Sequence, residues 1–191
     1  MKISDHVIIP YGRYPFDADG SKRPIEWYIL GSQNGCFLLL SKYCLDWQPF
    51  HVHSAVTWEN SEVRTLLNEV FLEEAFSPWE RDGILPVQVK TSEGCCHDEA
   101  DLMPDTGKET VDRIFLLSAW EAANYLPDDE ARKAELTPYA RQKGGTAGWW
   151  LRSRGASVSY AADVLGDGQV CASGEEVYEP GGIRPAMWVR F

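Results

Sequence analysis

Residues 148–153, GWWLRS, and residues 182–189, GIRPAMWV, decide the fold of this chain. Both are apolar runs of the kind that forms buried strands. The residues between them are mostly small and polar and are punctuated by glycine and valine. The pattern predicts a fixed apolar frame that carries an adjustable polar face, and we expect the function to reside on that face.

Further strands are predicted on both sides of this frame. In the C-terminal third we expect strands at 160–165, 169–172 and 183–189, with a tight turn at 166–168 between the first two. Near the N-terminus, residues 25–30 and 36–40 are apolar runs separated by Gly31–Gly35. This spacing predicts a β-hairpin, preceded by a short strand at 7–9.

Helices are predicted in the middle of the chain. Ser61 precedes an apolar stripe of helical spacing, which consists of Val63, Leu66, Leu67, Val70 and Phe71. Ser77 with Glu80 and Ser118 with Glu121 have the spacing of capping boxes and each predict a helix start. A further short helix is expected from Pro127 toward Leu136, and residues 91–112 are expected to form a long loop.

Strands at both ends and helices between them indicate an α+β fold in one domain, residues 1–191. We expect an antiparallel sheet that brings both ends of the chain together, with two or three helices and long loops. The net charge of −11 disfavours nucleic acid as a partner. No apolar run is long enough to span a membrane. Residues 1–6 lack the apolar core of a signal peptide, which predicts a cytoplasmic protein, with a cell surface or phage particle as the alternative.

The sequence predicts no metal and no cofactor, although two clusters carry metal-ligand chemistry. Cys95, Cys96 and His97 are contiguous, but the paired spacing of structural zinc sites is absent. His51 and His53 would share one side of a strand, without an obvious third ligand. We interpret both clusters as polar surface.

The conspicuous residues of the two apolar runs are expected to serve the fold. Trp149 and Trp150 are adjacent, so on a strand at most one indole naturally faces a ligand. Arg152 and Arg184 are expected to pair with acidic residues such as Glu26 or Glu59.

The polar residues between the runs are the better candidates for binding. Tyrosine supplies rigid contact area and serine adaptable hydrogen bonds. The predicted ligand-binding residues are Ser157, Ser159, Tyr160, Asp163, Asp167, Ser173, Glu175 and Tyr178.

Seven motifs spread along the chain resemble the DUF6273 family of bacterial domains, whose function is undefined. The motifs are Tyr11–Pro15, Pro24–Trp27, Leu38–Tyr43, Thr57–Ser61, Phe115–Ser118, Trp149–Ser153 and Gly182–Ala186.

The Trp-rich run, the glycine-punctuated strands and the terminal Gly-Ile-Arg strand are also similar to C-type-lectin-like domains. These include formylglycine-generating enzymes and the variable proteins of diversity-generating retroelements. The resemblance implies a C-type-lectin-like fold and a C-terminal binding face built from residues 155–179. The similarity to the retroelement proteins lies at residues 155–164 and 168–174 and implies that the codons there are diversified. Glu179–Gly181 departs from the calcium-binding Glu-Pro-Asn signature of sugar-binding lectins, so no calcium site is implied.

The function expected from this reasoning is a noncatalytic ligand-binding domain for a protein or cell-surface ligand. An enzyme on the same scaffold is the alternative, and its candidate residues are His51, His53, Cys95, Cys96, His97 and Cys171. A structural or assembly module of a phage or larger complex is the third hypothesis. No oligomeric state is predicted.

Overall fold

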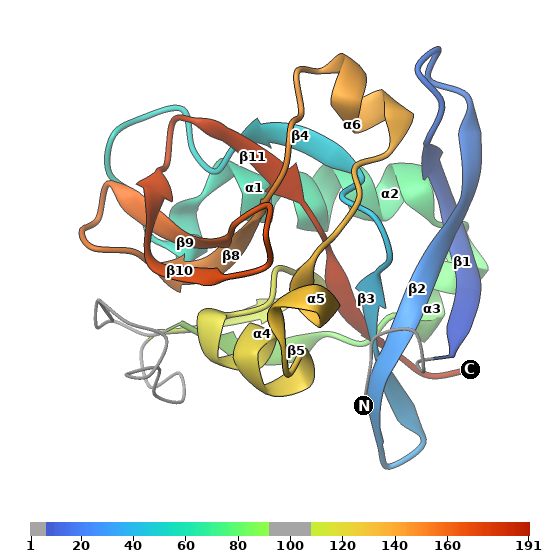
Figure 1. The fold of residues 1–191 in the computed structure, drawn as a ribbon. Helices are drawn as coiled ribbons and strands as arrows, with labels where there is room; N and C mark the ends of the chain where they lie inside the picture. Colours follow the sequence, from blue (N-terminus) through green and yellow to red (C-terminus); the bar gives the residue numbers. More distant parts are fainter. Residues whose placement is uncertain (1–6, 92–107) are drawn as a thin grey trace.

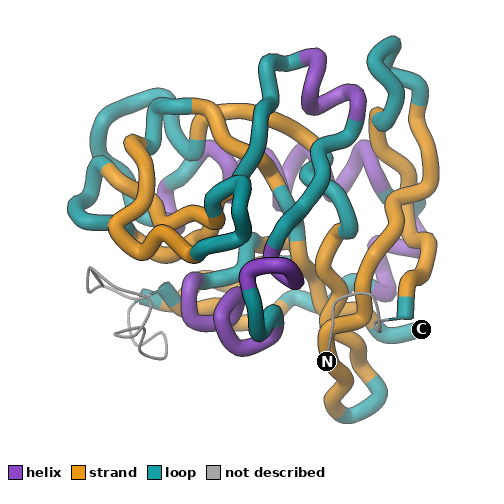
Figure 2. Tube along the Cα trace, viewed as in Figure 1, coloured by secondary structure: helices purple, strands orange, loops and turns teal. Residues whose placement is uncertain are grey.

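The computed structural model describes residues 7–91 and 108–191. Antiparallel sheets make up most of its regular structure, and the helices around them are short (Figures 1 and 2). This is the mixed helix and sheet composition that the sequence predicted. No helix among the described residues is long and apolar enough to cross a membrane.

The largest sheet has five strands in the order β1-β2-β3-β12-β7, and every pair is antiparallel. Its strands are β1 (Ile8–Pro15), β2 (Lys22–Gln33), β3 (Cys36–Ser41), β7 (Ile114–Phe115) and β12 (Ala186–Val189). The expected hairpin is β2–β3, with longer strands and a shorter turn than predicted. Its turn is Asn34-Gly35, with φ of 52° and 74°, which is the left-handed geometry that two-residue hairpin turns require.

The C-terminal strand β12 returns to this N-terminal sheet, as the sequence predicted. It lies between β3 and β7, with Ala186 opposite Leu40 and Phe115. Beyond it, the Phe191 ring lies 5.7 Å from the Tyr11 ring, measured between centroids. Aromatic packing therefore fastens the last residue to β1.

A second sheet contains three strands in the order β10-β9-β8 (Figure 1). They are β8 (Trp149–Arg154), β9 (Tyr160–Val164) and β10 (Val170–Glu176). The predicted turn at 166–168 is confirmed, since the Leu165 N–H donates to the Gln169 carbonyl across it. Strand β10 runs past the predicted end at Ala172, because a bulge at Gly174 lets it continue to Glu176.

Two short ribbons complete the strands. The first pairs β4 (Asp46–Pro49) with β11 (Pro180–Ile183), and the second pairs β5 (Val87–Lys90) with β6 (Glu109–Asp112). The single strand expected at 183–189 is therefore divided into β11 and β12. Pro185 lies between them and has no N–H for a ladder hydrogen bond.

Strand β6 corrects the loop expected at 91–112, whose last four residues are paired. Asp112 at the end of β6 is buried, and its carboxylate accepts hydrogen bonds from Trp58 Nε1 at 2.9 Å and Arg64 Nε at 2.7 Å. These partners are distant in the sequence and hold the strand in place. The local periodicity of residues 109–112 therefore could not predict the strand. Residues 92–107 of that loop lie outside the described residues.

The predicted apolar helix is a continuous helical segment with a π-helical centre. It consists of α1 (Glu62–Thr65), η3 (Leu66–Phe71) and α2 (Leu72–Ala75). The buried residues are Val63, Leu67, Phe71 and Ala75. Val70 is 45% exposed, contrary to the prediction, because the wider i→i+5 turns rotate it away from the core.

The other helices are single turns or little more. They are the 3₁₀ turn η2 (Trp58–Asn60), α3 (Pro78–Gly83), α4 (Ala119–Tyr125), α5 (Asp129–Arg132) and α6 (Pro138–Gln142). Both predicted capping boxes are confirmed at the starts of α3 and α4. The helix expected toward Leu136 ends at Arg132, and Leu136 instead forms a β-bridge with Cys44.

Candidate functional site

A cavity of about 450 Å³ lies where the three-stranded sheet meets the β4–β11 ribbon. Indoles and carboxylates dominate its wall. The side chains that matter here are Trp47, Trp150, Asp163, Glu175, Glu176 and Glu179, and we call this cavity the acidic pocket.

The pairing of the strands explains why Asp163 faces the pocket. On β9 it lies opposite Trp150 of β8 and Cys171 of β10, so these three side chains share one face of the sheet. The neighbouring Ala162 and Val164 are buried on the other face. A single polar residue is thus set into an apolar strand.

Strand β11 closes the pocket beside Trp150. The Trp150 Nε1 donates to the Gln48 carbonyl at 3.2 Å, which anchors the indole beneath the ribbon. A Cβ on Gly181 would lie 2.6 Å from that nitrogen, so only glycine lets the ribbon approach so closely. The ribbon in turn brings Glu179 and Trp47 to the same cavity.

Asp163 has unusual electrostatics for a carboxylate. Its Oδ1 is buried and has no hydrogen-bond partner among residues 7–91 and 108–191. Desolvation by burial, reinforced by the negative charge of Glu175, raises the pKa of Asp163 to about 7. A contact with the Cys171 thiol acts in the opposite direction and is weaker. The side chain can therefore change charge near neutral pH.

Glu176 accepts hydrogen bonds from two of the predicted tyrosines. The Tyr160 hydroxyl donates to Glu176 Oε1 at 3.3 Å, and the Tyr178 hydroxyl donates to Glu176 Oε2. That bond to the Glu176 carboxylate raises the pKa of Tyr178 to about 12. Tyr178 is exposed and Glu176 lines the acidic pocket, so we call this cluster beside the pocket its tyrosine rim.

The remaining predicted residues stabilise turns and the strand. Ser157 Oγ accepts from the Ser159 N–H at 3.1 Å, and Asp167 Oδ1 accepts from the Gln169 N–H at 3.1 Å. The Ser173 hydroxyl lies 3.4 Å from Cys171 Sγ. Only Asp163 and Glu175 of the predicted set line the acidic pocket itself.

Both tryptophans of the first apolar run are buried, each with 2% exposure. Trp149 Nε1 donates to the Arg132 carbonyl at 3.0 Å. The pocket wall therefore includes two buried indoles whose N–H groups are bonded to main-chain carbonyls.

The expectation that Arg152 pairs with an acidic residue is confirmed, although the partner is neither Glu26 nor Glu59, and the same expectation for Arg184 is wrong. Arg152 pairs with Glu121, with 2.9 Å between Nη2 and Oε1. Arg184 is fully buried, and among the described residues it has no acidic partner. Its guanidinium lies 4.9 Å from the centre of the Trp149 ring and donates to main-chain carbonyls, including that of Ser41 at 3.0 Å. Burial also lowers the pKa of Arg184 to about 10.

The metal-ligand candidates do not converge in the described part of the chain. His51 and His53 follow β4 in a loop rather than sharing a strand, with ring centroids 5.5 Å apart. Within residues 7–91 and 108–191 no three histidine, cysteine or carboxylate side chains are grouped to hold one metal ion. Cys95, Cys96 and His97 lie outside the described residues.

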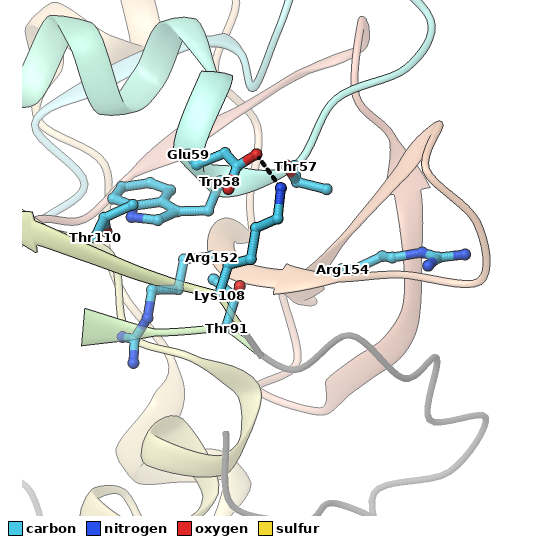
Figure 3. Close-up of a pocket in the computed structure, with 8 residues that line it drawn as sticks. All are labelled: Thr57, Trp58, Glu59, Thr91, Lys108, Thr110, Arg152 and Arg154. Atoms are coloured by element: carbon cyan, nitrogen blue, oxygen red, sulfur yellow. Dashed lines mark hydrogen bonds and ion pairs between the residues drawn. The ribbon is translucent and has the colours of Figure 1, made fainter. Parts of the chain in front are cut away.

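A second cavity, of about 270 Å³, is lined by residues of η2 and of the C-terminal half of β8 and is drawn in Figure 3. Its charged side chains are engaged with other protein groups. Lys108 Nζ binds Glu59 Oε1 at 2.8 Å, and Arg152 is bound to Glu121. Arg154 points away from the other labelled side chains (Figure 3). We therefore take the acidic pocket as the candidate site.

Sequence reasoning missed Trp47, Glu176 and Glu179 at this site. Glu176 and Glu179 lie in an acidic run just beyond the predicted strand, and that run was the available signal. Trp47 lies in the N-terminal part of the chain, far in sequence from the other pocket residues. The β4–β11 pairing brings it to the pocket.

One family model, the domain of unknown function DUF6273, matches residues 34–191. The motifs at 11–15 and 24–27 precede the matched range. No curated protein and no solved structure matches the chain.

Proposed function

The chain belongs to the DUF6273 family, and from its geometry we propose that it is a noncatalytic ligand-binding domain. Its binding face is the acidic pocket with its tyrosine rim, and its ligand is a protein or another cell-surface molecule. The observation that carries the proposal is the convergence of Asp163, Glu175 and the Glu176 cluster on one open cavity.

The division between frame and face supports this proposal. Gly174 has a φ of 73°, and a Cβ there would lie 2.0 Å from the Ala161 carbonyl oxygen, so the backbone tolerates no other residue. In contrast, the Tyr178 ring is 42% exposed at the surface. Such a surface can change its side chains while the strands remain in place.

We also propose that the fold is C-type-lectin-like. Two features support the likeness: the C-terminal strand β12 returns to the N-terminal sheet, and a separate small sheet, β8–β10, carries the candidate site.

The test uses the whole chain, fluorescently labelled, on a panel of bacterial cells scored by flow cytometry without calcium. The triple variant Tyr160→Ala/Asp163→Ala/Tyr178→Ala should lose binding, while Trp79→Ala, an exposed residue of α3, should retain it. Circular dichroism confirms that each variant is folded. Equal binding by wild type and a folded triple variant would refute the proposal.

Diversification of this face has a cheaper test. If it occurs, the surrounding DNA holds a reverse-transcriptase gene and a near-copy of the codons for residues 149–184 that differs at adenines. The absence of both removes the diversification hypothesis and leaves the binding proposal standing.

An enzyme on the same scaffold is the second candidate, and one observation favours it. Asp163, with its raised pKa, contacts the thiol of Cys171, which places a titratable carboxyl beside a nucleophile. Metal analysis of the purified chain separates the two hypotheses, since a stoichiometric metal would favour the enzyme.

A further inference from the structure

The acidic pocket concentrates negative charge without any balancing cation. Its lining includes Asp163, Glu175, Glu176 and Glu179, and no lysine, arginine or histidine is present among the described lining residues. Within the described part of the chain, none of these four carboxylates forms a salt bridge. A cavity with this lining attracts cations and repels anions.

The deepest carboxylate has an unmet acceptor. Asp163 Oδ1 is buried, and no donor among the described residues reaches it. A buried acceptor without a partner destabilises the folded chain. Asp163 lines the pocket, so a positively charged N–H group of a bound ligand would offset the charge of this carboxylate.

The aromatic wall suits an organic cation. Trp47 and Trp150 line the same cavity as Asp163. Aromatic rings attract ammonium and guanidinium groups and pack against the methylene stems that carry those groups. Trp47 is half-buried whereas Trp150 is buried, so Trp47 is the ring that a ligand can contact. The cavity volume of about 450 Å³ accommodates a side chain of that size.

A bare metal ion fits the pocket less well. The carboxylates are not grouped closely enough for three of them to hold one ion, judged over residues 7–91 and 108–191. Hard cations such as Ca²⁺ need six to eight oxygen ligands around a single point. An extended cation with an apolar stem instead uses both the carboxylates and the indoles.

We propose that the acidic pocket binds the cationic side chain of a protein ligand, a lysine ammonium or an arginine guanidinium, with Asp163 as its hydrogen-bond and charge partner. This inference rests on the proposed binding function and specifies the ligand chemistry of that same site. Glu175 and Glu179 add to the attraction from the mouth of the pocket.

The experiment is titration calorimetry on the whole chain at low ionic strength and pH 8. The probes are N-acetyl-lysine methylamide and N-acetyl-arginine methylamide, and the uncharged controls are the norleucine and citrulline analogues. We expect at least one cationic probe to bind about tenfold or more tightly than its uncharged control. The comparison between the two probes distinguishes ammonium from guanidinium recognition.

Three variants make the test specific. Asp163→Asn keeps the shape of the side chain and should lower the affinity for the cationic probe about tenfold or more. Glu179→Gln should weaken it less, and Asp82→Asn, an exposed carboxylate on α3, should leave it unchanged. Equal affinity for charged and uncharged probes, or full affinity in a folded Asp163→Asn variant, would overturn the inference.

The two proposals can fail separately. If cells bind wild type but not the triple variant, and neither cationic probe binds, the binding function stands and the cation inference fails. If a probe binds through Asp163 while the triple variant binds cells as well as wild type does, the pocket is a cation site and the proposed function fails.

Discussion

Replacing Asp163 by asparagine should remove a pH-dependent loss of stability. The pKa of this carboxyl is about 7 in the folded chain and near 3.8 in the unfolded chain. Between those pH values the folded state holds a proton that the unfolded state has released. The stabilisation from Asp163 is therefore full below about pH 4 and is lost as the pH rises through 7.

The size of the effect follows from the pKa change. Each pH unit between the two values alters the free energy of unfolding by about 1.4 kcal/mol, which gives a ceiling of about 4 kcal/mol above pH 7. Asp163 is only half-buried as a residue, so water near its second oxygen reduces this ceiling by roughly half. From pH 5 to pH 8 we expect Asp163→Asn to gain about 1–3 kcal/mol relative to wild type.

The assay is urea unfolding, followed by tryptophan fluorescence at half-unit steps of pH. Asp82→Asn is the matched control, because Asp82 is an exposed carboxylate on α3. Its unfolding free energy should follow that of wild type across the whole range. If the Asp163→Asn and wild-type curves also run parallel, Asp163 does not titrate near neutrality and the electrostatic reasoning about the pocket is wrong.

Four further changes test the site and the frame. Affinity for the cationic probe should rise about tenfold from pH 6 to pH 8, because Asp163 must ionise to bind it, and calorimetry in matched buffers should show proton release. Gly174→Ala should destabilise the chain by more than about 2 kcal/mol in urea unfolding, because of its positive φ and the clash with the Ala161 carbonyl. Ser118→Ala removes one half of the α4 capping box and should cost about 1 kcal/mol, whereas Ser118→Thr should cost little. Arg184→Met should remove the guanidinium bonds while retaining bulk, and thermal unfolding should show a loss of about 1–3 kcal/mol.

The features that could be predicted from the sequence are those determined by neighbouring residues. The β2–β3 hairpin and the turn at 166–168 depend on glycines close to the strands they join. The helix starts at Ser77 and Ser118 depend on a carboxylate three residues later. In each case the residues that produce the feature lie within a few positions of it. A local sequence pattern is therefore enough to predict it.

The features that escaped prediction depend on partners far along the chain. Strand β6 forms because the Asp112 carboxylate meets Trp58 and Arg64. Arg184 has no acidic partner among the described residues and instead donates to main-chain carbonyls of two separate segments, at Ser41 and Arg132. No local pattern records such contacts.

The candidate site was predicted in part for the same reason. Asp163 and Glu175 were found because they lie on the polar face between the apolar runs. Trp47 was missed because only the β4–β11 ribbon brings it there. The other residues that line the pocket lie about a hundred residues or more later in the sequence.

The position of β12 between β3 and β7 has a consequence for protein synthesis. Strand β3 ends at Ser41 and its partner β12 begins at Ala186, so about 145 residues must be translated between them. At the usual rate of about 5–20 residues per second, the ribosome needs roughly 7–30 s to supply that partner. During this interval one edge of β3 has no strand beside it, and open edges invite pairing between chains. A nascent chain that stalls before residue 186 should therefore aggregate or recruit chaperones, although most of its residues have already been made.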